Sequence, residues 1–204
     1  MEYLWATILF AISSSVTPGP NNIMVMTSGL NFGVMKSLPL LTGICVGFTV
    51  MLLLVGLGFG QLFDLFPMLH LLIKCIGTAY LLYLAWLIAR SSDAIQTAAQ
   101  TQPFGFMKGA LFQWVNAKAW VVATGAIAAF TTVGANFVTQ NLTIAATFFV
   151  VSFPCVGVWL IFGSLLKKWL QSPKQRQWFN WVMAALLVVS VIPVVREIVY
   201  QLNV

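Results

Sequence analysis

The sequence predicts an all-α integral membrane protein with six transmembrane helices, arranged as two inverted repeats of three helices. The first observation is that 60% of the residues are hydrophobic and 7% are charged, whereas a soluble domain carries about a quarter charged residues. The second is that the apolar residues form continuous runs, which are typical of membrane helices and not of alternating barrel strands. The third is that one run in each half of the chain carries a polar interruption near its middle.

Six apolar runs are long enough to be spans. A helix rises 1.5 Å per residue, so about 20 residues are needed to cross a hydrocarbon core of about 30 Å. We expect the spans near residues 4–28, 38–60, 69–89, 108–130, 142–166 and 178–200.

The basic residues predict the orientation. Short cytoplasmic loops are enriched in Lys and Arg, and the loops after the first, third and fifth spans hold most of them: Lys36, Arg90, Lys108, Lys167, Lys168, Lys174 and Arg176. The loops after the second and fourth spans hold none. The chain is therefore expected to be a multi-pass protein of the bacterial inner membrane, with both termini on the periplasmic side.

A polar stretch divides the chain into halves. Residues 91–104 are rich in Ser, Gln, Thr and Ala and are interpreted as a cytoplasmic linker. Residues 1–90 and 105–204 would then form two three-helix repeats of one transmembrane domain. Because each repeat has an odd number of spans, the two would lie upside down to each other, as in many secondary transporters.

The first interruption is Thr17-Pro18-Gly19-Pro20-Asn21-Asn22. Two prolines remove backbone N–H groups and clash with the preceding turn, so the helix should break here. The freed carbonyls must then face protein or a water-filled cavity. Thr17 is expected to cap the restarted half-helix, with Pro18 at its first position. The positive end of that half-helix would favour an anionic group such as a carboxylate.

The second interruption lies in the fourth span, where Asn116 and Lys118 stand well inside the hydrophobic run. An ammonium group there is costly unless it is paired or hydrated. Counting from the cytoplasmic end, both interruptions lie roughly 12 to 15 Å deep. Pro154 in the fifth span reaches a similar level and is a candidate for shaping a cavity wall.

Other interpretations use the same residues. The prolines could be packing kinks, and the asparagines could only bridge helices. The single cysteines Cys45, Cys75 and Cys155 are interpreted as small buried hydrophobes. With three of them in spans, a membrane thiol-redox carrier is one alternative, and a non-transporting structural subunit is another. No metal-ligand cluster or catalytic constellation is present, and His70 lies at the end of a span, so we expect no enzyme, metal or cofactor. The net charge of +6 is dispersed between apolar runs and predicts no nucleic-acid binding.

With these motifs in view, the chain resembles the lysine-exporter superfamily, in particular its homoserine, threonine and cysteine exporter branch (LysE/RhtB). The resemblance covers the whole length. It rests on the stretch from Thr17 to Asn22 with the following Gly-Leu-Asn-Phe-Gly, on Thr42-Gly43 and Val55-Gly56-Leu57-Gly58, on Lys74 with Gly77-Thr78-Ala79-Tyr80-Leu81, and on Asn116-Ala117-Lys118. Many members have Pro where this chain has Ala117, so it is open whether the fourth helix is broken.

The resemblance implies efflux of small neutral or polar amino acids, driven by an ion gradient, with cysteine-like or homoserine-like substrates. Alternating access around a midplane site is expected, with the substrate held by Thr17, Pro18, Gly19, Pro20, Asn21, Asn22, Asn116 and Lys118. No carboxylate lies at the midplane, so Lys118 and Lys74 are the candidate coupling residues, because burial disfavours the charged form of Lys. A bundle this small is compatible with homo-oligomers.

Overall fold

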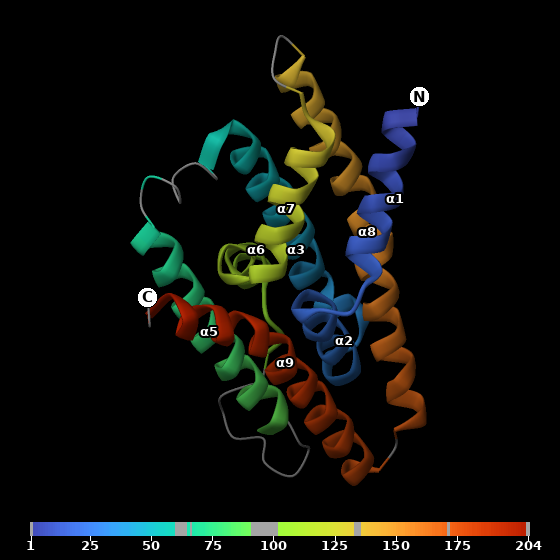
Figure 1. Ribbon diagram of the computed structural model, residues 1–204. Helices are drawn as coiled ribbons and strands as arrows, with labels where there is room; N and C mark the ends of the chain where they lie inside the picture. Colours follow the sequence, from blue (N-terminus) through green and yellow to red (C-terminus); the bar gives the residue numbers. More distant parts are fainter. Residues whose placement is uncertain are drawn as a thin grey trace.

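Every element in the described part of the chain is a helix, which confirms the predicted class (Figure 1). The computed structural model describes residues 2–59, 65, 67–90, 102–132, 136–170 and 172–202, apart from the side chains of residues 2, 3, 59, 67, 69, 70, 197, 201 and 202. Most of the predicted linker, and the side chain of His70, lie outside this part. The helices are α1 (Glu2–Val16), α2 (Pro20–Phe32), α3 (Val34–Leu54), the π-helix η1 (Val55–Phe59), α5 (Pro67–Arg90), α6 (Phe106–Val115), α7 (Ala117–Phe130), α8 (Phe137–Trp169) and α9 (Pro173–Leu202).

Within the described residues, four helical stretches are each long and apolar enough to cross a membrane. They are Val34–Gly58, Leu71–Arg90, Phe137–Trp169 and Pro173–Tyr200. The first and fourth predicted spans are instead pairs of half-helices of 15 and 13 residues and of 10 and 14 residues. Both interruptions found in the sequence are therefore real breaks in the helical backbone.

The predicted cap of the second half-helix is wrong by two residues. Gly19, not Thr17, is the N-cap of α2, and Pro20, not Pro18, occupies its first turn. The residue before a proline is pushed towards extended backbone, and Gly19 has φ −175° and ψ 179°. Pro20 is tolerated at the start of a helix because the N–H that it lacks would have no partner within the helix there.

Glycines bring helices into backbone contact. A side chain at Gly163 of α8 would run into the carbonyl of Met26 in α2, and one at Gly43 of α3 would run into the carbonyl of Phe106 in α6. A side chain at Gly77 of α5 would likewise run into the carbonyl of Val115 in α6. Small residues permit such close approach between membrane helices, so these glycines set which helices pack together.

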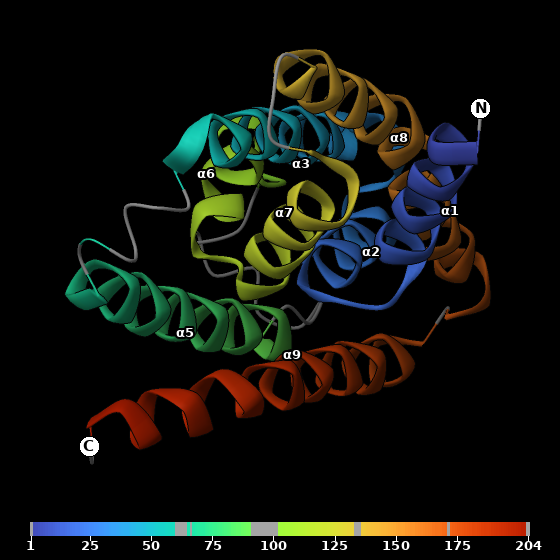
Figure 2. The same cartoon turned by 45° about the horizontal axis from the view of Figure 1, so that its top comes forward.

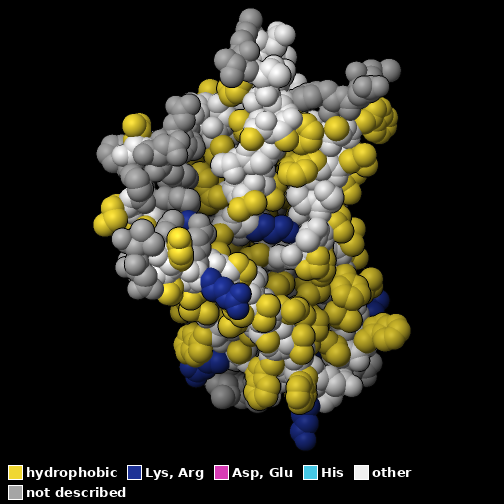
Figure 3. All heavy atoms as spheres, in the orientation of Figure 1, with side chains coloured by type: hydrophobic (Ala, Val, Ile, Leu, Met, Phe, Trp, Pro, Cys, Tyr) yellow, Lys and Arg dark blue, Asp and Glu magenta, His cyan; other side chains and the backbone are white. Residues whose placement is uncertain are grey.

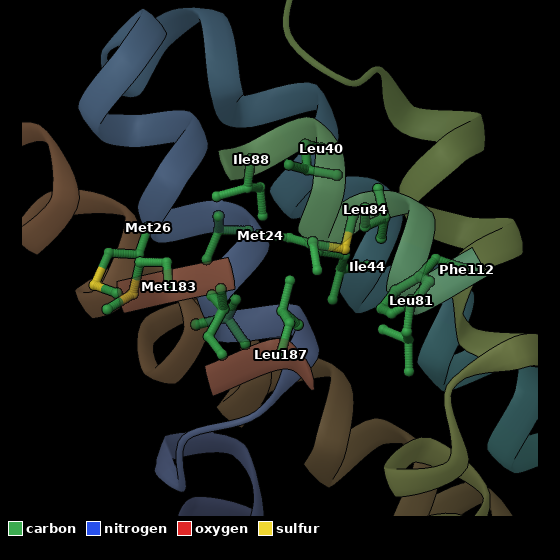
Figure 4. Packing of buried hydrophobic residues seen from close by; sticks show 14 of the residues in the cluster. Met24, Met26, Leu40, Ile44, Leu81, Leu84, Ile88, Phe112, Met183 and Leu187 are labelled. Carbon is green, nitrogen blue, oxygen red and sulfur yellow. The ribbon is translucent and has the colours of Figure 1, made fainter. Parts of the chain in front are cut away.

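Buried side chains form two clusters with α3 and α8 in common. The larger cluster joins α2, α3, α5, α6, α8 and α9, and Figure 4 shows Met24, Leu84, Phe112 and Leu187 meeting within it. The smaller cluster joins α1, α3, α7 and α8 around Phe148. The two clusters meet at the level of the helix breaks.

Apolar side chains also cover the outside of the molecule. Figure 3 shows them over most of the described surface on one face, and α5 and α9 lie side by side in both ribbon views (Figures 1 and 2). Trp86 of α5 is 50% exposed and Trp178 of α9 is 66% exposed. Cys75 of α5 is exposed as well, so its predicted burial is wrong, although a sulfhydryl on a lipid-facing helix remains a small apolar contact.

Candidate functional site

One side chain joins the two helix breaks. The Lys118 Nζ, in the first turn of α7, donates a hydrogen bond of 2.7 Å to the carbonyl oxygen of Thr17, which lies in the segment between α1 and α2. Gly19 of the same segment lies under the Lys118 side chain: a Cβ added there would be 2.9 Å from Cδ and 3.1 Å from Nζ. The ammonium group that the sequence placed inside the membrane is therefore bound to backbone that the prolines released.

Other carbonyls at the end of α1 are also bonded by side chains. The Asn22 Nδ2 donates to the carbonyls of Ser15 (2.9 Å) and Thr17 (3.0 Å), and the Trp159 Nε1 of α8 donates to that of Val16 (3.1 Å). The Thr17 hydroxyl donates to the carbonyl of Ser13 in its own helix. Because the last carbonyls of a helix have no partner within it, these bonds let the chain end α1 inside an apolar bundle.

The second break is made without proline. Asn116 has φ −88° and ψ 103°, and its side-chain oxygen accepts a hydrogen bond of 3.2 Å from the backbone N–H of Lys118. Asn is among the strongest N-capping residues because its side chain replaces the missing backbone acceptor. Ala117 therefore does not leave the fourth helix continuous.

An amide pair adds a second bridge between the half-helices. The Asn21 Nδ2 donates to the Gln113 Oε1 (2.9 Å), and the Gln113 Nε2 donates to the Asn21 Oδ1 (3.0 Å). Gln113 also donates to the carbonyl of Gly109, and its side chain is fully buried. The start of α2 is thereby bound to α6, and the start of α7 to the end of α1.

A cavity of about 50 Å³ lies against both breaks. Its lining comes from α1, α2, α3, α7 and α8 and from the two break segments, and consists of Ser14, Ser15, Gly19, Asn21, Asn22, Ile44, Cys45, Phe48, Asn116, Lys118, Ala119, Val122, Phe148, Ser152 and Val156. Ile44, Cys45 and Val156 belong to the larger core cluster, and Phe48 and Phe148 belong to the smaller one. The cavity therefore lies where the two clusters meet.

The polar groups of this cavity suit a zwitterion. Lys118 uses one N–H group on Thr17, and an ammonium group has three. The hydrogen bonds among the described residues use the Asn22 Nδ2 and the Asn116 Oδ1, and none of them uses the Asn22 Oδ1 or the Asn116 Nδ2. Donors from Lys118 and Asn116 complement a carboxylate, and the acceptor on Asn22 complements an ammonium group. The N-termini of α2 and α7 also lie at this cavity. Because the N-terminus is the positive end of a helix dipole, they further favour a carboxylate.

The structure brings together five of the predicted site residues: Gly19, Asn21, Asn22, Asn116 and Lys118 line the cavity. The side chains of Thr17, Pro18 and Pro20 do not, although the Thr17 carbonyl holds Lys118. Sequence reasoning missed the serines Ser14, Ser15 and Ser152. The run Ser13-Ser14-Ser15 directly before the first break could have indicated the first two.

Lys74 lies in a different place. It lines a second cavity, of about 210 Å³, together with Thr78 and with Val115 and Ala117, the two residues that flank Asn116. Asn116 and Lys118 line the first cavity and not the second. The two candidate coupling lysines are therefore on opposite sides of the second break.

The described residues contain no group of three His, Cys, Asp or Glu side chains that could hold a metal ion. Cys45, Cys75 and Cys155 are all free; Cys45 lines the first cavity, and Cys75 is exposed on α5. None of them forms the disulfide that a redox carrier would use.

The chain is similar to known proteins over the region that contains this site. The family model described as LysE type translocator matches residues 12–196, which include both breaks and the lining of the cavity. The chain belongs to the LysE-type translocator family. A protein of Klebsiella pneumoniae named cysteine/O-acetylserine efflux protein is 31% identical over 202 residues, 94% of this chain and 96% of that protein.

Proteins with the same name in Salmonella typhimurium and Escherichia coli are 35% and 34% identical over 122 residues, 59% of this chain and 62% of each protein. No solved structure matches the chain. Membership of this family confirms the predicted resemblance, and with it the prediction of an amino-acid exporter and not an enzyme.

Proposed function

We propose that this LysE-family translocator exports small neutral or polar amino acids from the bacterial cytoplasm by holding the zwitterion in the cavity at the two helix breaks. The observation that carries the proposal is the Lys118 ammonium group, which reaches from α7 to the Thr17 carbonyl at 2.7 Å and lines the cavity. Lys118 is half-buried, and a cation there with N–H groups to spare favours an anionic or polar partner. The carboxylate of an amino acid is such a partner.

Both charged groups of the amino acid, the carboxylate and the ammonium group, would be held by the protein. Lys118 and the Asn116 amide would donate to the carboxylate, and the Asn22 Oδ1 would accept from the ammonium group. Discontinuous helices whose positive ends point at an anionic substrate group are a recurrent design of secondary transporters. The relatives named for cysteine and O-acetylserine efflux carry substrates with this head group.

Transport would proceed by alternating access, with an ion gradient as the driving force and Lys118 and Lys74 as the candidate coupling residues. The proposed repeats are residues 1–90 and 105–204. What supports them is the shared order of elements: a helix broken at its middle, then a long helix, then a third helix that pairs with its counterpart (α5 with α9). The proposed location is the inner membrane with both termini periplasmic. The exposed apolar faces of α5 and α9 suit lipid or a second copy of the chain.

Counterflow in proteoliposomes tests the proposal. Purified protein in vesicles loaded with one unlabelled amino acid should accumulate the same labelled amino acid for small neutral members of a panel, and not for Lys or Glu. Asn22→Ala should raise the KM about tenfold, the loss of one hydrogen bond to a charged group. Asn31→Ala is the matched control, because Asn31 lies in the same helix outside the cavity. Absence of counterflow by the wild-type protein for every amino acid would overturn the proposal.

A further inference from the structure

Ser152 of α8 has a hydroxyl group that the protein does not use. The residue is 5% exposed and lines the cavity, and none of the hydrogen bonds among the described residues uses its hydroxyl. Hydroxyls within neighbouring membrane helices bond their own backbone: Thr49 donates to the carbonyl of Cys45, Thr147 to that of Thr143, and Ser190 to that of Leu187. A buried hydroxyl that makes no such bond loses free energy unless something in the cavity bonds it.

The surroundings of Ser152 are apolar. Phe148 lies one turn earlier on α8, and its ring is 5.3 Å from that of Phe48 on α3, centroid to centroid. Ile44, Cys45 and Val156 complete this side of the cavity. The groups that suit the head group come from α2 and α7, whereas this apolar wall with a single hydroxyl comes from α3 and α8. The arrangement separates head-group recognition from side-chain recognition.

We infer that Ser152 determines substrate specificity by hydrogen-bonding a polar atom in the side chain of the transported amino acid. The inference rests on the proposed function. It assigns to one residue the preference for a short side chain with an oxygen or sulfur atom, which the family resemblance implies. A site built to bond a hydroxyl or thiol discriminates against an analogue that lacks one, because the buried partner is then left unpaired.

An isosteric pair of protein variants and isosteric pairs of substrates test this inference. Ser152→Thr and Ser152→Val have nearly the same volume and differ in the hydroxyl. Serine and 2-aminobutyrate, or homoserine and norvaline, differ in the same way among substrates. In counterflow competition the wild-type protein and Ser152→Thr should prefer serine and homoserine over their apolar partners. Ser152→Val should lose about tenfold of that preference.

The controls separate this inference from the proposed function. Ser190→Ala removes a hydroxyl from α9, outside the cavity, and should leave the preference unchanged. If branched side chains at position 152 prevent folding, Ser152→Ala compared with Ser152→Cys gives the same contrast. Equal preference in the Val and Thr variants, or no preference in the wild-type protein, would overturn the role of Ser152 while amino-acid transport persists. Loss of all counterflow in the wild-type protein would instead overturn the proposed function.

Discussion

The two helix breaks serve one cavity but are built differently. Between α1 and α2 the chain uses Pro18, Gly19 and Pro20, and the released carbonyls are bonded by Asn22 just after the break and, from other helices, by Lys118 of α7 and Trp159 of α8. Between α6 and α7 both partners are local: the Asn116 side chain caps the next helix, and the Trp120 Nε1 donates to the carbonyl of Trp114 at 2.8 Å.

A membrane protein can therefore break a helix in two ways, which differ in the hydrogen-bond partners that they require. The Pro18-Gly19-Pro20 segment breaks its helix, whereas the single prolines Pro39 and Pro154 lie inside continuous helices. The polar groups that the break frees then need partners, some of them on other helices. An asparagine cap breaks the helix and supplies its own partner. The first break should therefore be sensitive to changes in side chains that are distant in the sequence, and the second to changes at Asn116 and Trp120, which are close to it in the sequence.

The largest effect should come from Lys118, the link between the breaks. Lys118→Met keeps most of the length of the side chain but removes the bond to the Thr17 carbonyl and the cation offered to a carboxylate. We expect kcat/KM for counterflow to fall roughly 10- to 100-fold, the value of one or two charge-assisted hydrogen bonds. Lys174→Met, at an exposed position at the start of α9, should transport normally. An unchanged rate in Lys118→Met would mean that the two breaks work independently.

Gly19→Ala should act on the same link with a smaller effect. The backbone at Gly19 is extended, which Ala adopts freely, but the new Cβ would lie 2.9 Å from the Lys118 Cδ and 3.1 Å from Nζ. The flexible lysine should move aside and lose its geometry, lowering apparent substrate affinity about tenfold. Gly125→Ala in α7 meets open space and serves as the control in the same affinity measurement. Equal behaviour of the two variants would contradict the contact.

Two substitutions at Asn116 should separate capping from substrate binding. Asn116→Ser keeps a capping oxygen but loses the amide donor, so KM should rise about fivefold with little change in thermal stability. Asn116→Ala loses both, and should also lower the free energy of unfolding by about 1 kcal/mol. Thermal melting in detergent and counterflow kinetics give the two readouts. Equal stability of the Ser and Ala variants would show that the second break is not self-capped.

The smallest effect is expected at the end of α1, where the Trp159 side chain bonds the Val16 carbonyl. Trp159→Phe keeps an aromatic ring but removes the donor to the Val16 carbonyl, which should cost about 1 kcal/mol and lower Tm by about 2 to 4 °C. Trp178→Phe, on the exposed surface of α9, should leave Tm unchanged. If both variants have the same Tm, the stability of the end of α1 does not depend on α8.

Much of this site could be predicted from local chemistry. Proline removes N–H groups and asparagine caps helices in any fold, so the Pro18-Gly19-Pro20 segment and Asn116 indicated breaks before any contact was known. Lys118 in an apolar run is costly wherever it packs, and that cost indicated a functional position. The capping error at Thr17 has a local cause too: Pro20 forces Gly19 to be extended, so α2 begins two residues later than predicted.

The sequence by itself determined the helical class and the places where two helices are broken, because apolar runs, proline and asparagine act through the backbone next to them. Only the tertiary structure decided which groups meet at those places. Gln113 pairs with Asn21 across 92 residues of sequence, Ser152 comes to the cavity from α8, and Lys74 lies on the other side of the second break. These outcomes depend on how close glycine contacts bring α2 to α8 and α3 to α6, and such packing is a property of pairs of helices that no single segment encodes.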